Sequence, residues 1–377
     1  MKNRMISCFL LITLLVTGCG AGEEQMINGG GTPDYTEGTV DESVFEEKFY
    51  YEQFSEEEQL VYQEVYQGIV DCQKKITVHS NDGELVNRIV QAVLFDFPEI
   101  FWKDGSGKSA IYNDTYIVLE LTYTYVDGQK DKRETEIKNE VAQIIGEASK
   151  QEGEYEKIKY IYEYLVEHVA YVEDSSDNQN IYSSIVNKES VCAGYAKANQ
   201  LLLEQLGIPC IYVTGTATNR DGSDSHAWNI VKCDGKYYYV DVTWADSMKQ
   251  DEAILYDYLC CDEQILNKTH VAEGNYDFPK CDSSELNYYR LNHMYYEKVE
   301  RDKLLDEMYQ SIDAKEESTT FKFSNADVYK EAKELIIDEL MSIASQYLGE
   351  EYGLQEVQCG YEMLDELHRF IIYWKYE

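Results

Sequence analysis

Residues 225–244, SHAWNIVKCDGKYYYVDVTW, have the pattern of two β-strands joined by a tight turn. The Asp-Gly dipeptide in the middle is a strong two-residue hairpin signal, and β-branched and aromatic residues flank it. A two-residue turn at this point pairs Cys233 with Lys236. Counting back along both strands then places Trp228 opposite Asp241. The predicted hairpin therefore carries a histidine near its entrance and an aspartate near its exit.

This register places His226 and Asp241 on the same face of the hairpin. His226 is two residues from Trp228, so it is the diagonal neighbour of Asp241. Diagonal pairs stand roughly 7–8 Å apart at the backbone, which a histidine–carboxylate hydrogen bond can span. A slip of one residue would put the two side chains on opposite faces. A lone histidine in a strand is more often a packed core residue, so a third group is needed to indicate chemistry.

Residues 191–210, VCAGYAKANQLLLEQLGIPC, provide a candidate for that group. A helical apolar pattern follows Cys192 and ends at Gly207, so this cysteine falls at a helix N-terminus. Unpaired N–H groups and the helix dipole favour a thiolate there, and the same groups can stabilise an oxyanion. We expect the small residues Ala193 and Gly194 to leave room for a substrate. The alternative interpretation is a buried structural cysteine.

A thiolate nucleophile needs an imidazole as acid and base, and the imidazole needs a carboxylate that fixes its tautomer. Cys192, His226 and Asp241 meet these needs in that order. Together, SVCAGYAKANQLLLEQLGIPCIYVTGTA and the hairpin resemble the core of the transglutaminase-like superfamily, a rearranged relative of papain-like proteases. The resemblance covers roughly residues 154–246. It implies an α+β fold in which the helix carrying the cysteine packs on an antiparallel sheet.

The resemblance also implies the roles of the site residues: Cys192 as nucleophile, His226 as base and acid, and Asp241 as its orienting partner. Side chains that could form the oxyanion hole or wall the site are Tyr171, Tyr182, Trp228 and Trp244, all of which could equally be packing residues. Histidines that we expect to be structural or solvent-facing are His168, His270 and His293. We expect no cofactor and no metal, because the calcium requirement of animal relatives has no recognisable loop in this sequence.

The first residues, MKNRMISCFLLITLLVTGCG, are typical of an export signal. Two basic residues precede a short apolar run, and small residues precede Cys19. The Val-Thr-Gly-Cys stretch resembles the lipobox of bacterial lipoproteins, which implies a lipidated Cys19 on the extracellular face of the cell membrane. The alternative is a cleaved secretory signal with an incidental cysteine. Residues 20–44 are rich in Gly, Glu and Thr, a composition that indicates a flexible linker.

After the signal peptide and the linker, the chain divides into three predicted parts. They are an N-terminal α/β module at 45–150, a transglutaminase-like catalytic domain at 151–282 and a C-terminal α+β module at 283–377. Ser55 with Glu58 has the form of a capping box. In the C-terminal module, Ser324 with Asp327 could cap a long helix.

The composition limits the class of partner. The formal net charge is −38, so nucleic acid and anionic membrane surfaces are repelled, and a lipid anchor would have to hold the protein at a membrane. Ten cysteines contain no CxxC pair that would indicate zinc, and no glycine-rich phosphate loop occurs. The expected partners are therefore protein or peptide substrates at the cell surface.

The sequence thus predicts a membrane-anchored thiol enzyme that attacks amide carbonyl groups. With water as acceptor it would hydrolyse or deamidate, and with an amine it would crosslink. The alternative from another class is a non-catalytic binding or scaffold module with the same fold.

Overall fold

The structure is a computed structural model that describes residues 33–112, 115–219, 222–247, 254–274 and 276–376. The predicted signal peptide at 1–19, Cys19 included, lies outside these residues. Within the described ranges, no helix is long and apolar enough to cross a membrane. The chain forms two compact units, one up to Ser283 and one from Ser284 to Glu377.

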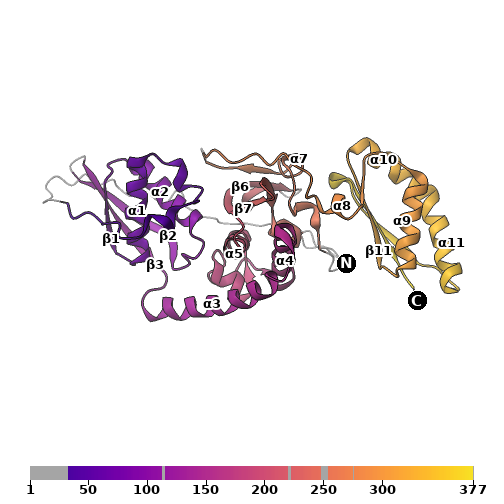
Figure 1. The fold of residues 1–377 in the computed structure, drawn as a ribbon, viewed down its shortest axis with the longest axis horizontal. Coiled ribbons are helices and arrows are strands. Elements are labelled where there is room, and N and C mark those ends of the chain that lie inside the picture. The colour runs from indigo at the N-terminus through magenta and orange to yellow at the C-terminus, as the bar shows by residue number, and fades with distance from the viewer. Residues whose placement is uncertain (1–32, 113–114, 220–221, 248–253, 275, 377) are drawn as a thin grey trace. The chain divides into compact units, whose positions relative to one another are not determined.

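The first unit begins with a module of two helices and a three-stranded antiparallel sheet in the order β1-β3-β2 (Figure 1). The predicted capping box is confirmed, because Ser55 and Glu58 each bond the other's backbone N–H. The helix that this box caps, α1, buries its apolar face against the sheet. The elements are η1 Glu42–Phe45, η2 Tyr51–Gln53, α1 Glu56–Val70, β1 Lys75–Val78, α2 Gly83–Asp96, β2 Lys103–Tyr112 and β3 Tyr116–Tyr123.

The module includes residues that the sequence places in the linker. The backbone N–H of Thr36 donates to the carbonyl of Thr77 in β1 over 3.0 Å. The ring of Tyr35 stacks on His79, with ring centroids 3.4 Å apart. Two residues of the predicted linker, a tyrosine and a threonine, thus have specific contacts with the module.

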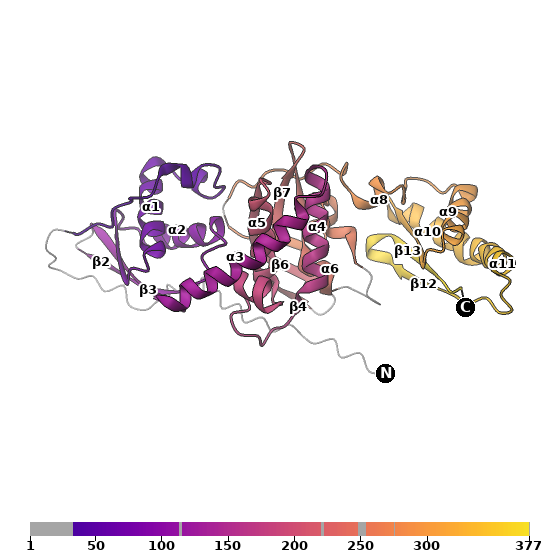
Figure 2. The same ribbon diagram turned by 60° about the horizontal axis from the view of Figure 1, so that its bottom comes forward.

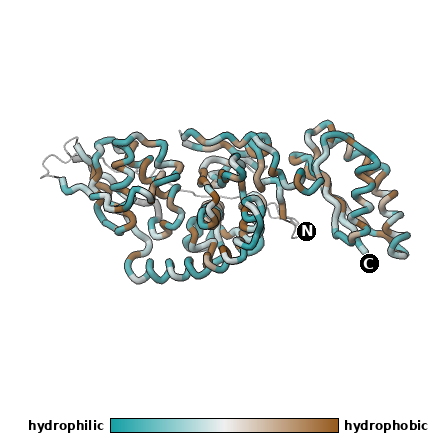
Figure 3. Tube along the Cα trace, viewed as in Figure 1, coloured by the Kyte–Doolittle hydropathy of each residue, from teal (hydrophilic) through white to brown (hydrophobic). Residues whose placement is uncertain are grey.

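Two helices lead from the module to the core of the first unit: α3 (Gly128–Ala148) and α4 (Gly153–His168). α3 is mostly hydrophilic along its length (Figure 3) and buries Ile137, Ile144 and Ala148. It contacts both α4 and α5, which it crosses in Figure 2.

The core is a four-stranded antiparallel sheet in the order β8-β7-β6-β9. The predicted register is confirmed: Cys233 pairs with Lys236, and Ile230 pairs with Tyr239. The ladder ends one pair before Trp228 and Asp241. Besides α3 and α4, the core region of the first unit contains β4 Ala170–Tyr171, η3 Ser183–Asn187, β5 Glu189–Ser190, α5 Cys192–Gln205, β6 Cys210–Asn219, β7 Gly222–Cys233, β8 Lys236–Val240, α6 Val242–Ser247, η4 Tyr256–Tyr258, α7 Glu263–Leu266 and β9 His270–Ala272.

Helix α5 packs against β7 of this sheet through a pair of buried amides. The side-chain amide of Asn199 donates to Oδ1 of Asn229 over 3.0 Å, and Nδ2 of Asn229 donates to the carbonyl of Ala196 over 3.0 Å. Buried hydrogen bonds between side-chain amides fix how a helix lies on a sheet. This arrangement confirms the predicted α+β class, with the cysteine helix on an antiparallel sheet.

The module and the core are joined by contacts at the far end of α5 from Cys192. The hydroxyl of Tyr50 donates to the carbonyl of Tyr212 over 2.5 Å, and Lys48 forms an ion pair of 3.0 Å with Glu204. A cavity of about 730 Å³ lies here, lined on the α5 side by Leu201, Glu204 and Gln205.

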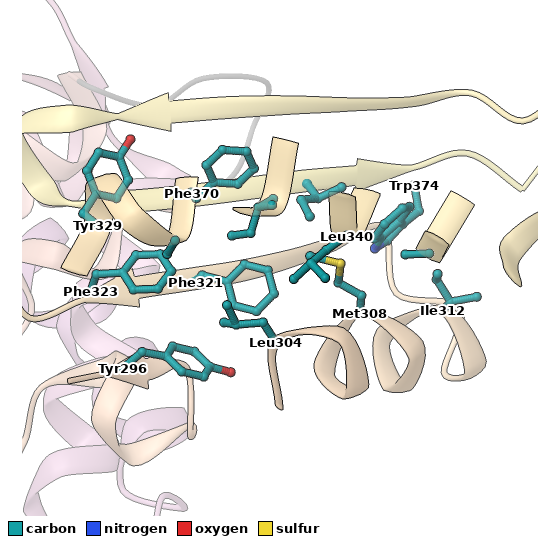
Figure 4. Packing of buried hydrophobic residues seen from close by; sticks show 14 of the residues in the cluster. Tyr296, Leu304, Met308, Ile312, Phe321, Phe323, Tyr329, Leu340, Phe370 and Trp374 are labelled. Carbon is teal, nitrogen blue, oxygen red and sulfur yellow. The ribbon is translucent and has the colours of Figure 1, made fainter. Parts of the chain in front are cut away.

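The second unit is a four-stranded sheet in the order β10-β11-β13-β12, with helices on one side (Figures 1 and 4). The predicted cap at Ser324 is wrong, because Asn325 is the N-cap and accepts from the N–H groups of Asp327 and Val328. The elements are α8 Tyr288–Leu291, β10 Tyr295–Tyr296, α9 Arg301–Asp313, β11 Ser318–Phe323, α10 Ala326–Leu335, η5 Ile336–Leu340, α11 Met341–Tyr352, β12 Cys359–Leu364, η6 Asp365–Leu367 and β13 Arg369–Trp374.

Phe370 is fully buried in this unit's core and provides a test of its packing (Figure 4). Phe370→Ala should lower the local stability of β11 and β13 by about 3–5 kcal/mol, because it leaves a cavity in a closed core. Tyr361→Ala is the matched control, since Tyr361 stacks on Phe370 from outside and is 46% exposed. Hydrogen exchange of the two strands measures both effects. Equal losses in the two variants would contradict this packing.

Candidate active site

Cys192 is the first residue of α5, and its side chain is only 1% exposed. Val191 precedes it in an extended conformation and accepts from the N–H groups of Gly194 and Tyr195 over 3.0 and 3.2 Å. The first N–H groups of a helix have no acceptor within the helix, and they form its positive end. The cysteine therefore lies at the N-terminus of a helix, as the sequence predicted.

The segment before α5 is fixed by a small hydroxyl network. Ser190 Oγ donates to the carbonyl of Asn178 over 2.7 Å and lies 2.8 Å from Ser183 Oγ. A Cβ on Gly194 would come within 1.9 Å of Ser190 Oγ. The expectation that Gly194 leaves room for a substrate is therefore wrong: serine hydroxyls fill that space, and glycine is needed so that α5 can start against them.

His226 and Asp241 form the hydrogen bond that the hairpin register predicts. Nε2 of His226 lies 2.7 Å from Oδ2 of Asp241, and the side chains are 8% and 1% exposed. The ring's other nitrogen, Nδ1, is then available for the Cys192 thiol, which is within hydrogen-bond contact of His226. The structure thus brings all three predicted residues together.

Interactions within this cluster shift the pKa values of His226 and Asp241 in opposite directions. Burial lowers the pKa of His226, but the Asp241 carboxylate and the Cys192 thiol outweigh burial and raise that pKa overall. Burial raises the pKa of Asp241, but its hydrogen bonds and charge interactions with His226 and His270 lower it overall. Both shifts favour an imidazolium beside a carboxylate. An imidazolium is the state of His226 after it has taken the thiol proton.

Asp241 is held by more groups than the sequence indicated. Its Oδ1 accepts the N–H of Trp244 over 2.9 Å, and its own N–H donates to the carbonyl of Tyr258 over 3.0 Å. Nε2 of His270 lies 3.0 Å from Oδ2, the atom that also binds His226.

Of the two alternatives expected for His270, the structure shows a buried residue and not a solvent-facing one: it is 2% exposed, and its partner is Asp241. His168 and His293 are exposed, as expected. No local pattern could reveal His270, because β9 has three residues and pairs with β6, more than fifty residues earlier.

The two tryptophans have different positions around the cluster. Trp228 is buried, and its ring centroid lies 6.1 Å from that of His226 and 5.1 Å from that of His270. Trp244 is half-buried and makes an edge contact with His226 at 5.4 Å. Of the two, Trp244 is therefore the better candidate for a wall that a substrate touches.

The two tyrosines proposed for the oxyanion hole also differ. The hydroxyl of Tyr182 donates to Glu136 of α3 over 2.9 Å, and its ring lies beside Arg133. Its side chain is thus engaged with α3. Tyr171 is half-buried in β4 and pairs with Ser190, two residues before Cys192. Tyr171 therefore remains the candidate that strand pairing brings beside the segment just before Cys192.

Two groups of side chains among the described residues could hold a metal ion. Ligand atoms of His226, Asp241 and His270 lie within 4.8 Å of one another, as do those of Glu154, Cys233 and Asp234. In the first group, each of these atoms already takes part in a hydrogen bond at 2.7 or 3.0 Å. A metal there would remove Nε2 of His226 from Asp241, so it would compete with the hydrogen-bonded arrangement.

The other cysteines differ from Cys192 in their surroundings. All eight described cysteines are free thiols. Burial raises the pKa of six of them, to about 12 for Cys233 and Cys281. The other four thiols whose pKa is raised by burial are Cys72, Cys210, Cys260 and Cys261. These thiols stay protonated near neutral pH, whereas Cys192 has a histidine partner.

The fold is a mixed α/β domain in which a cysteine at the start of a helix lies close to a histidine and an aspartate carried by the hairpin. Residues 141–242 match the family model of the transglutaminase-like superfamily. This segment, a little over a quarter of the chain, is a transglutaminase-like core, and it contains Cys192, His226 and Asp241.

Solved structures similar to the chain include a TGase, with 17% identity and a TM-score of 0.28 over 48% of this chain and 53% of that one. A proposed cysteine protease from Cytophaga hutchinsonii has 16% identity and a TM-score of 0.28 over 48% of this chain and 80% of that one. A proposed protease from Parabacteroides distasonis has 14% identity and a TM-score of 0.23 over 33% and 28%. The chain spans about half the length of the TGase structure. A comparison with curated proteins gave no match.

Gly194→Ala tests how the cysteine is positioned. The added methyl group meets Ser190, so we expect a loss of about 1–3 kcal/mol in the free energy of unfolding. Gly146→Ala in α3 is the control, since nothing lies within 4 Å of its Cβ, and it should gain about 0.5–1 kcal/mol. Urea unfolding measures both. A neutral Gly194→Ala would show that α5 does not need this close packing.

Proposed function

We propose that this protein is a thiol acyl-transfer enzyme that attacks amide carbonyl groups of proteins or peptides through Cys192. The observation that carries the proposal is the chain of contacts from the Cys192 thiol to His226, and from Nε2 of His226 over 2.7 Å to Asp241. These three side chains lie within the transglutaminase-like core. Nucleophile, acid–base group and orienting carboxylate are the parts that acyl transfer by a thiol requires.

In the first half of the reaction, His226 takes the thiol proton and the thiolate attacks the amide carbon. A C–S bond forms, and the carbonyl oxygen becomes an oxyanion beside the first N–H groups of α5. The imidazolium of His226 then gives its proton to the amide nitrogen. The C–N bond breaks, ammonia or an amine leaves, and a thioester on Cys192 remains.

In the second half, an acceptor with a lone pair attacks the thioester carbon while His226 removes its proton. The C–S bond breaks and Cys192 returns to its starting state. Water as acceptor gives hydrolysis or deamidation, and a lysine amine gives a crosslink. Since the same three side chains serve each outcome, the surrounding surface selects the acceptor.

We further propose that the enzyme works on the extracellular face of the cell membrane, held by a lipid on Cys19. Support for this comes from the sequence: a basic start, a short apolar run and the lipobox-like residues before Cys19. The net charge of −38 gives no attraction to an anionic membrane surface. Proteins and peptides of the cell surface are then the substrates within reach.

Turnover tests the proposal directly. A glutamine-containing peptide and a fluorescent primary amine should yield ammonia, labelled peptide or both, and Cys192→Ala should abolish every product. Asp241→Asn should lower kcat about a hundredfold or more, because His226 loses the partner that orients its ring and stabilises its charge. Product that persists in Cys192→Ala would refute the mechanism. An inert wild type that binds the peptide would favour the binding-module alternative.

The raised pKa of His226 predicts how Cys192 reacts with iodoacetamide. Near pH 7 Cys192 should react faster than the other described thiols, because His226 is within hydrogen-bond contact and can accept the thiol proton. Asp241→Asn removes the charge that raises the pKa of His226, so the rate at Cys192 should fall about tenfold or more. Half-buried Cys72 is the internal control, since burial raises its pKa. Mass spectrometry of both peptides gives the two rates. Equal rates at Cys192 and Cys72 would contradict the pairing of thiol and imidazole.

The lipid anchor is tested by cell fractionation. Cys19→Ala should move the protein out of the membrane fraction and prevent incorporation of labelled palmitate, because it removes the acylated thiol. Cys8→Ala, in the apolar run of the leader, is the matched control and should leave both unchanged. Membrane retention of Cys19→Ala equal to the wild type would exclude this anchor.

A further inference from the structure

The carboxylate of Asp241 binds two imidazoles through one oxygen atom. Oδ2 lies 2.7 Å from Nε2 of His226 and 3.0 Å from Nε2 of His270, and the two rings are 5.2 Å apart. The other oxygen, Oδ1, accepts the backbone N–H of Trp244. The buried carboxylate is therefore satisfied by three donors, of which only one is the proposed acid–base group.

The protonation pattern of this cluster follows from the acceptor. An ionised carboxylate can only accept hydrogen bonds, so Nε2 of each histidine must carry a hydrogen atom. Nδ1 of His270 lies 2.8 Å from the hydroxyl of Thr269, which gives that nitrogen its own partner. Nδ1 of His226 is left for the Cys192 thiol. His270 thus favours the arrangement in which His226 can act on the sulfur.

His270 is held in place by two tryptophan rings and by the close approach of its strand, β9, to β6. Edge contacts from the rings of Trp228 and Trp244 lie at 5.1 and 4.7 Å. β9 approaches β6 closely at Gly215, where a Cβ would come within 2.1 Å of the carbonyl of Val271. A residue packed and bonded in this way can hold its partner in a single rotamer.

We propose that His270 is a positioning residue of the thiol site: it holds Asp241 in the orientation that bonds Nε2 of His226. This inference rests on the proposed function. Without His270, Oδ2 of a buried carboxylate loses one of its donors, and the carboxylate can turn away from His226. Loss of a hydrogen bond to a charged group lowers the rate about ten- to a hundredfold when the bond matters in the transition state.

Three variants test the proposal in steady-state kinetics with the peptide and amine assay. His270→Phe should lower kcat about tenfold or more and leave KM within about twofold, because Asp241 touches no substrate. His270→Gln should restore most of kcat, since its amide N–H can reach Asp241 in place of Nε2. His168→Gln, at an exposed helix end, is the matched control and should behave as wild type. Unchanged kcat in His270→Phe, or equal losses in both His270 variants, would overturn the proposal.

A second measurement separates this inference from the enzyme proposal, because it needs no turnover. In the Cys192→Ala protein with ¹⁵N-labelled histidine, the Nε2–H proton of His226 should give a downfield NMR signal. That signal should persist in His270→Gln and be lost to solvent exchange in His270→Phe. Persistence in His270→Phe would overturn the positioning role even if the enzyme is active. Zinc that binds the Cys192→Ala protein tightly and not the His270→Gln form would also overturn it, because His270 would then be a metal ligand.

Discussion

The hydrogen bond between Nε2 of His226 and Oδ2 of Asp241 is the interaction on which the candidate site depends. It is almost fully buried, so the imidazolium and the carboxylate gain more from each other than they would in water. It also decides which ring nitrogen faces the sulfur. The antiparallel hairpin fixes this bond in space, because a shift of one residue would turn His226 and Asp241 to opposite faces.

The remaining structure brings a sulfur to that pair and keeps it there. Helix α5 is bound to the sheet through Asn199 and Asn229, and its first turn rests on the hydroxyl groups of Ser183 and Ser190. The N-terminal module contacts the other end of α5 through the ion pair of Lys48 with Glu204, and it contacts β6 through the hydroxyl of Tyr50. The helix that carries the nucleophile thus has fixed contacts at both ends.

The hairpin and the cysteine helix could be predicted because their signals are local. An Asp-Gly turn sets a register, and an apolar helical pattern that starts at Cys192 sets a helix N-terminus. The contact of His270 with Asp241 and that of Tyr35 with His79 could not be predicted, since each joins residues far apart in the chain. The close packing at Gly194 involves the nearby Ser190, but it depends on how the segment before α5 folds back against the helix start. Local sequence specifies which face a residue takes, whereas the partners across that face come from the tertiary fold.

The central claim is that Cys192 forms a covalent acyl intermediate. A glutamine-containing peptide, mixed with the enzyme and quenched in acid within one turnover, should leave the peptide acyl group on Cys192 as a hydroxylamine-sensitive thioester. Mass spectrometry of the digested protein locates the adduct. The account predicts the added mass on the peptide with Cys192, and its loss after hydroxylamine. An adduct on a different residue, or product formation without any acyl-enzyme, would contradict it.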